Sequence, residues 1–271
     1  IISTGKSAAD LINMSESKRR HHDEEELKSM SLGDHLEELR ARLILSLVGL
    51  AAASIIGLVF GKWFLQFILW PYKRAMTELN IEMKLLAIDV PEPFMVYLKA
   101  SLVLGILICS PWLFYQIWAF ISAGLYTHER RFVKMVAPAS AFLFTTGVLF
   151  FLTVIAPFVF KFFVRFNPGI DYLNYQPSLT KSVNFILILS LVFGAAFQTP
   201  IAIVFAERMG LVSVETLCRV RKYVFLGCFV VGAIATPPDV VSQISLAVPL
   251  YFLYESSIIV CRIWRRKRQV K

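Results

Sequence analysis

Carboxylates and guanidinium groups meet at two places in the sequence, beside the ends of long apolar runs. Glu38 stands four residues before Arg42, the spacing at which opposite charges pair on a helix. Glu129 is the only acid between the second and third apolar runs, directly before Arg130 and Arg131. Glu38 and Arg42 are interpreted as an exposed pair on a helix at the membrane surface. Glu129 has two interpretations: an internal salt bridge with its neighbouring arginines, or a carboxylate that binds a cationic partner.

Two more polar side chains, Gln198 and Glu255, fall inside apolar runs. An acid at membrane depth is a candidate functional group by default, because burying a charge in hydrocarbon is costly. The alternative for Glu255 is a salt bridge near the membrane surface with Arg262, Arg219 or Arg221. We expect Glu255 to have a structural or partner-contact role.

The remaining reactive residues predict no catalytic or metal site. The four histidines lie outside the apolar runs, so no Ser–His or metal–His site can form within them. The cysteines show no CxxC pair and no metal-ligand spacing, and we expect free thiols. No Walker motif is present. We therefore expect a protein that is not an enzyme and has no cofactor or metal. The residues concerned are His21, His22, His35, His128, Cys109, Cys218, Cys228 and Cys261.

The composition is typical of a membrane protein. Of the 271 residues, 57% are hydrophobic and 17% are charged, whereas a soluble domain carries about 25% charged residues. The mean hydropathy is +0.64. A soluble globular enzyme is therefore excluded, and so is disorder over most of the length.

Six apolar runs predict six transmembrane helices. A helix needs about 20 apolar residues to cross roughly 30 Å of hydrocarbon. The fifth run has only 16 residues, and Glu255 closes off the sixth early, so these two spans are expected to be short. Prolines in or at the ends of the later runs predict kinks. We expect an all-α polytopic membrane protein, a cupped and kinked bundle with two short C-terminal spans. The runs are 43–61, 100–127, 135–160, 182–206, 223–238 and 240–261, and the prolines are Pro138, Pro157, Pro200 and Pro249.

The basic residues predict the orientation in the membrane. Cytoplasmic connections carry an excess of lysine and arginine. If both termini are on the same side, that side holds 20 of the 28 basic residues and the other side holds 8. Both termini are therefore predicted to be cytoplasmic. This asymmetry explains the net charge of +9, so no nucleic-acid partner is expected.

The segments outside the apolar runs divide the chain into three parts. Residues 1–30 are polar and lack the apolar core of a signal peptide, so we expect a flexible cytoplasmic tail. Residues 31–262 form the membrane domain, and residues 263–271 form a basic cytoplasmic tail. The domain is expected to begin with a helix at the membrane surface that leads into the first span. Residues 63–72 are too short to span and are expected to cap the outer face.

Three motifs follow one another along the chain, each at a defined side of the membrane. They resemble the TatC family, the multispanning subunit of the twin-arginine protein translocase, from about Ser31 to Cys261. Pro71 and Phe94 are further outer-face positions of this resemblance. The motifs are His35-Leu36-Glu37-Glu38-Leu39-Arg40; Gln116-Ile117-Trp118-Ala119-Phe120, continuing through Gly124-Leu125 to Glu129-Arg130-Arg131; and Thr236-Pro237-Pro238-Asp239-Val240 with Gln243.

The resemblance implies a receptor and core component of the translocase, which binds Arg-Arg signal peptides and helps export folded proteins with the proton-motive force. It implies that Glu38 and Glu129 bind the two arginines. Guanidinium binds carboxylate through two parallel hydrogen bonds, a geometry that lysine cannot copy. The cytoplasmic motif residues that would support the two acids are Leu36, Arg40, Phe120, Arg130 and Arg131.

The resemblance also implies the partners and the location. The partners are twin-arginine signal peptides of folded precursors, small single-span TatA/TatB-type subunits, further copies of the chain and the lipid bilayer. The bacterial cytoplasmic membrane is favoured over an organellar membrane.

Two positions depart from the family pattern. Many members carry Glu where Gln198 stands, and many carry Pro where Ala123 stands. Gln cannot ionise, so only hydrogen bonding is retained at that site. The alternative function is a polytopic solute transporter or channel subunit. It would need a polar lining, which one Gln and one Glu scarcely provide, and the runs show no broken-helix repeat.

Overall fold

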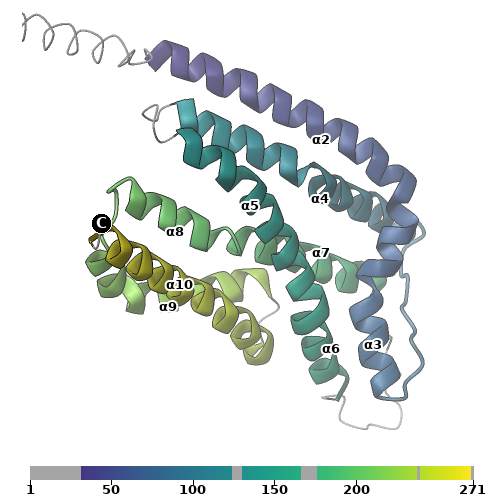
Figure 1. The fold of residues 1–271 in the computed structure, drawn as a ribbon. Coiled ribbons are helices and arrows are strands. Elements are labelled where there is room, and N and C mark those ends of the chain that lie inside the picture. The colour runs from purple at the N-terminus through teal and green to yellow at the C-terminus, as the bar shows by residue number, and fades with distance from the viewer. Residues whose placement is uncertain (1–31, 124–129, 166–175, 237–238, 270–271) are drawn as a thin grey trace, which may run out of the picture.

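The computed structural model describes residues 32–123, 130–165, 176–236 and 239–269 (Figure 1). Within these ranges the chain is helical, and its only β contact is an isolated bridge between Leu86 and Ser178. The all-α prediction is confirmed. The elements are α2 (Leu32–Ile68), α3 (Trp70–Glu78), α4 (Glu92–Ala123), α5 (Arg130–Phe150), the π-helical turn η1 (Phe151–Ile155), α6 (Ala156–Arg165), α7 (Leu179–Ala196), α8 (Thr199–Arg208), α9 (Val214–Ala235) and α10 (Val240–Gln269).

All six predicted membrane spans correspond to helices. Five segments of the described chain are long and apolar enough to cross a membrane: Leu36–Glu78, Glu92–Ser122, Met135–Arg165, Leu179–Arg208 and Val240–Arg266. The other predicted span is the apolar part of α9, from Tyr223 to Ala235, about 20 Å of helix. This span is short, as predicted, and α9 packs along α10. The sixth run was also predicted to be short, but it belongs to the segment Val240–Arg266, which is long enough to cross. The last helix, α10, continues past Glu255 to Gln269.

The helix ends that are predicted to be cytoplasmic lie together (Figure 1). The start of α2, the end of α4, the start of α5, the end of α8 and the end of α10 all lie at one end of the bundle. The helices α3 and α6 lie at the other end. This arrangement agrees with the orientation predicted from the basic residues, in which both termini share one side.

Small residues let α2 lie very close to α4. Gly49, Ala53, Gly57 and Gly61 recur every four residues and therefore share one face of α2. A Cβ atom on Gly57 would overlap the carbonyl oxygen of Ser101 on α4. Close backbone approach through small residues is a common way for membrane helices to associate. This contact joins α2, which has most of its apolar side chains exposed, to the rest of the bundle.

The core lies in the outer half of the bundle, where α3, η1, α6 and α7 meet. Phe151 and Phe193 are fully buried, with ring centroids 5.2 Å apart. Tyr72 on α3 packs edge-on against Phe160 on α6 at 5.3 Å. The capping helix is therefore fixed to the bundle by aromatic contacts.

Prolines interrupt two of the spans. Pro157 follows the π-helical turn Phe151–Ile155, and its missing N–H explains why the regular ladder of hydrogen bonds changes there. The fourth predicted span is divided between α7 and α8 at Phe197 and Gln198, just before Pro200. The prolines predicted kinks at these positions but not a break in the fourth span.

The outer cap begins later than the sequence suggested. Residues 63–68 continue α2, so the predicted boundary of the cap at residue 63 is wrong. The cap is α3, which has Pro71 in its first turn. Proline is favoured at this position because a first-turn N–H has no helical partner.

Candidate functional site

The cytoplasmic end of α2 carries the predicted pair of Glu38 and Arg42. The Nε and Nη2 atoms of Arg42 donate to Glu38 Oε1 at 3.1 and 2.8 Å. The third contact of this guanidinium, from Nη1, is to Oε1 of Gln116 on α4 at 3.1 Å. Gln116 is buried, so the pair is attached to the wall formed by α4. The helical spacing of Glu38 and Arg42 predicted their salt bridge, and the structure confirms it.

Only one of the two carboxylate oxygens of Glu38 takes part in this pair. Both contacts from Arg42 go to Oε1, and Oε2 is buried without a hydrogen-bond partner among the described residues. The side chain as a whole is 20% exposed. An ionised carboxylate can accept about four hydrogen bonds. With two hydrogen bonds from Arg42 in place, the group retains acceptor capacity for about two more.

The second predicted acid, Glu129, lies outside the described residues. Arg130 and Arg131 begin α5, but their side chains also fall outside the description. The approach of Glu129 to Glu38 therefore stays a prediction. Of the other predicted cytoplasmic residues, Leu36 and Arg40 are exposed and Phe120 is half-buried.

Gln198 takes part in a hydrogen-bond network that links three spans. Its Nε2 donates to the carbonyl oxygen of Ser140 on α5 at 2.9 Å. The Oγ of Ser140 accepts from Trp118 Nε1 on α4 at 2.8 Å. Gln198 itself stands at the break between α7 and α8. The predicted intramembrane polar residue thus has an internal partner and stabilises the packing where the fourth span is interrupted.

Glu255 pairs with one of the three arginines considered for it. Arg221 Nη2 on α9 lies 2.9 Å from Glu255 Oε2 on α10. The hydroxyl of Tyr251 donates to Glu255 Oε1 at 2.9 Å. Arg262 instead contacts Cys218 through its Nη2 atom. The acid thus joins α9 to α10.

The outer motif also joins α9 to α10. Asp239 Oδ2 accepts from the backbone N–H of Ser242 at 2.6 Å and so caps the start of α10. Gln243 Nε2 donates to the carbonyl oxygen of Phe229 on α9 at 3.0 Å. Pro237 and Pro238 lie outside the described residues. Among the other outer positions, Pro71 is buried at the start of α3, and Phe94 is exposed.

Glu92 is an outer-face residue whose role the sequence did not suggest. Its Oε2 accepts from the N–H groups of Ile88 at 2.6 Å and Asp89 at 3.3 Å. Its Oε1 accepts from Thr180 N–H at 2.7 Å and from Ser178 Oγ at 3.3 Å. One carboxylate thus holds the loop before α4 against the start of α7. The position between two prolines was visible in the sequence, but the partners 86 and 88 residues away were not.

Gln116 and Trp118 were also missed as individual residues. Both belong to the second motif, but the sequence analysis gave neither side chain a hydrogen-bonding role. In the structure, Gln116 orients Arg42 and Trp118 binds Ser140. A polar side chain inside the apolar run 100–127 was the available signal for Gln116.

These features define a class: a multi-pass α-helical membrane protein with a charged, partly satisfied cluster at its cytoplasmic end. Comparison with known proteins places it more narrowly. The family model described as Sec-independent protein translocase protein (TatC) matches residues 34–249. The chain therefore belongs to the TatC family, whose members are protein translocase components and not catalytic enzymes.

Individual relatives agree with this assignment. The Sec-independent protein translocase protein TatC of Desulforapulum autotrophicum is 40% identical over 235 residues, covering 87% of this chain and 85% of that one. The TatC protein of Escherichia coli strain K12 is 33% identical over 230 residues, covering 85% and 87%. The relatives are bacterial, and with the membrane-crossing helices they make the chain a multi-pass protein of the bacterial inner membrane.

A solved structure has the same fold. The crystal structure of a twin-arginine translocase receptor, TatC, superposes with a TM-score of 0.76 at 34% sequence identity. The match covers 84% of this chain and 98% of that chain. The bundle described above is therefore the TatC fold.

Proposed function

We propose that this chain is the receptor subunit of a twin-arginine translocase and that Glu38 and Glu129 bind the two arginines of a signal peptide. The half-satisfied carboxylate of Glu38 is the observation that carries this proposal. One oxygen is already held by Arg42, which fixes the direction of the carboxylate. The other oxygen is buried and has no partner within the described part of the chain, so it would gain a hydrogen bond from an incoming guanidinium that displaces the side chains over it.

The chemistry favours arginine over lysine. A guanidinium presents its donors in a planar fork, whereas the ammonium of lysine is a compact, strongly hydrated charge. Hydrogen bonds between ionised partners are about twice as strong as neutral ones. With Glu38 at one end of α2 and Glu129 beside the start of α5, each acid would take one arginine of the pair.

The rest of the translocase supplies what this chain lacks. The sequence contains no Walker motif, so we propose that export is driven by the proton-motive force. Small single-span subunits and further copies of the chain are the proposed partners in the membrane. The long exposed apolar face of α2, with Ile55 at 65% and Val59 at 71% exposure, provides surface for lipid or such helices.

A binding titration tests the receptor function. The purified protein is titrated with a fluorescent Arg-Arg signal peptide and with its Lys-Lys counterpart. We expect a preference of about tenfold or more for the Arg-Arg peptide, since about 1.4 kcal/mol corresponds to one order of magnitude. Glu38→Ala and Glu129→Ala should each reduce the affinity and the preference.

The matched control is Glu37→Ala, which removes an exposed acid next to Glu38. It should leave both titrations unchanged. Equal binding of the two peptides by the wild-type protein would contradict the receptor function and favour the transporter alternative. Equal loss in Glu37→Ala and Glu38→Ala would show that only the net charge of the segment matters.

A further inference from the structure

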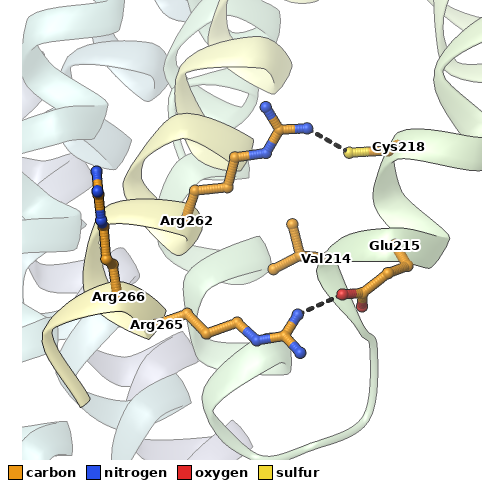
Figure 2. A pocket seen from close by; sticks show the side chains of 6 residues that line it. All are labelled: Val214, Glu215, Cys218, Arg262, Arg265 and Arg266. Atoms are coloured by element: carbon orange, nitrogen blue, oxygen red, sulfur yellow. Dashed lines mark hydrogen bonds and ion pairs between the residues drawn. The ribbon is translucent and has the colours of Figure 1, made fainter. Parts of the chain in front are cut away.

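A basic pocket lies at the cytoplasmic end of the bundle, between the start of α9 and the end of α10. Its volume is about 530 Å³. Figure 2 shows the guanidinium groups of Arg262 and Arg265 on α10 turned toward Cys218 and Glu215 on the first turns of α9, while Arg266 points away from α9. The pocket is lined by Val214, Glu215, Cys218, Arg262, Arg265 and Arg266.

The positive charge of this pocket exceeds the negative charge. Arg265 forms an ion pair with Glu215, and Arg262 donates to the Cys218 sulfur at 2.9 Å. A thiol is only a weak acceptor, so it does not neutralise Arg262. Arg266 has no ion pair within the described residues. The described lining residues, with three arginines and one glutamate, carry a formal charge of +2.

The location of the pocket indicates the kind of anion that would balance this charge. The pocket arginines lie where α10 leaves the membrane, since the apolar segment of this helix ends at Arg266. Ile263 and Trp264 stand between them and are 50% and 40% exposed. Tryptophan favours the level of the lipid headgroups, and an exposed isoleucine favours the acyl chains below them.

The start of α9 adds to the attraction for an anion. Ser213 caps this helix, with its Oγ accepting from Thr216 N–H at 3.1 Å. The N-terminal end of a helix carries a partial positive charge that favours anions. The helix end, Arg262 and Arg265 therefore act on the same small volume, which Arg266 lines from the side of α10.

We propose that this pocket binds the phosphate of an anionic phospholipid from the cytoplasmic leaflet. Basic pockets between membrane helices on the cytoplasmic side are suited to such headgroups. The headgroup would lie beside Arg262 at the mouth of the pocket, within reach of the long side chain of Arg266, and its acyl chains would descend along the exposed apolar side of α10. A lipid in this position would bridge α9 and α10. The proposal is independent of signal-peptide binding, which involves α2 and α4.

The test is lipid binding to the purified full-length protein in detergent, measured by native mass spectrometry. Phosphatidylglycerol and phosphatidylcholine are titrated in parallel. The wild-type protein should bind phosphatidylglycerol in preference. The variant Arg262→Gln/Arg266→Gln should bind it about tenfold or more weakly, because each basic group near the surface contributes to headgroup attraction. Binding of phosphatidylcholine should not change.

The matched control is Arg208→Gln/Arg219→Gln, which removes two positive charges from the same side of the membrane outside the pocket. It should keep the phosphatidylglycerol affinity within about twofold. Equal weakening in both double variants would overturn the proposal, since only total charge would then matter. Unchanged binding in Arg262→Gln/Arg266→Gln would also overturn it.

A variant that is expected to bind phosphatidylglycerol more tightly excludes misfolding as the cause of weaker binding in the arginine variants. Glu215→Gln removes the one acid of the pocket and frees Arg265, so the affinity for phosphatidylglycerol should rise several-fold. A fall or no change would contradict the proposal. Competition by inorganic phosphate at millimolar concentration distinguishes the source of the anion. Full displacement of phosphatidylglycerol by phosphate would overturn the lipid as occupant.

Discussion

Arg42 contacts one of the two carboxylate oxygens of Glu38 and leaves the other without a partner among the described residues. The same guanidinium donates to Gln116 on α4 at 3.1 Å. The direction of the Glu38 carboxylate therefore depends on a residue one turn away and on a buried amide of a different span. An acid held in this way is oriented before any ligand arrives, which lowers the entropy cost of binding.

Loss of the Gln116 amide should weaken signal-peptide binding without removing any charge. In Gln116→Leu, Arg42 loses its anchor on α4, and the carboxylate of Glu38 becomes free to turn. A hydrogen bond to a charged group contributes about 1.5–3 kcal/mol, so we expect the affinity for an Arg-Arg peptide to fall about tenfold. Fluorescence anisotropy measures this affinity. Gln66→Leu, at an exposed site on α2, is the control, and equal affinities for both variants would show that Gln116 has no orienting role.

A methyl group at Gly57 should separate α2 from α4. The new Cβ would overlap the carbonyl oxygen of Ser101, and backbone cannot move aside as a flexible side chain can. Overpacking of this kind costs about 1–3 kcal/mol. The Gly57→Ala variant should therefore unfold at a lower concentration of denaturing detergent, or at a lower temperature, than the wild-type protein. Gly227→Ala is the control, because no atom lies within 4 Å of its new Cβ. Equal stability of the two variants would contradict the close contact.

Glu92→Gln should loosen one of the two segments that the carboxylate holds. Each oxygen serves a different segment: Oε2 accepts from Ile88 and Asp89, and Oε1 accepts from Ser178 and Thr180. A glutamine has one acceptor oxygen and one donor nitrogen, so one segment must lose its acceptor. Hydrogen exchange should accelerate several-fold in peptides covering Ile88 or Thr180. Glu82→Gln removes an exposed outer acid and should change neither, and unaltered exchange in Glu92→Gln would refute this role.

Much of the architecture could be predicted from the sequence, because burying a charged side chain in hydrocarbon costs free energy. Charge-free runs predicted the membrane helices, and helical spacing predicted the salt bridge between Glu38 and Arg42. The face formed by Gly49, Ala53, Gly57 and Gly61 was a further signal in the sequence, because small residues at intervals of four allow close helix packing. It marks the place where the backbones of α2 and α4 approach each other.

Contacts between spans could not be predicted in the same way. Gln116 and Arg42 meet because of the register of α4 against α2, and the sequence of either helix alone does not determine that register. Three arginines were equally reasonable partners for Glu255, and the packing of α9 on α10 selects Arg221. Pro200 marked where the fourth span would bend, and α7 ends at Ala196, the residue whose carbonyl Pro200 cannot bond.

The ion pair of Arg221 and Glu255 should show energetic coupling in a double-mutant cycle. Their atoms are 2.9 Å apart, and the side chains are 38% and 26% exposed, so solvent screens the pair in part. Arg221→Met should destabilise the protein because it leaves the acid beside apolar residues without its partner. Glu255→Gln keeps an acceptor for the hydroxyl of Tyr251 while removing the charge. We expect the double variant to be more stable than the two single losses predict, with a coupling free energy of about 1 kcal/mol, measured by thermal unfolding in detergent. The control is the exposed pair of Lys84 and Glu82, whose atoms are 2.8 Å apart, and it should show no measurable coupling. Strictly additive losses of stability for the Arg221 and Glu255 variants would mean that this pair does not hold α9 to α10.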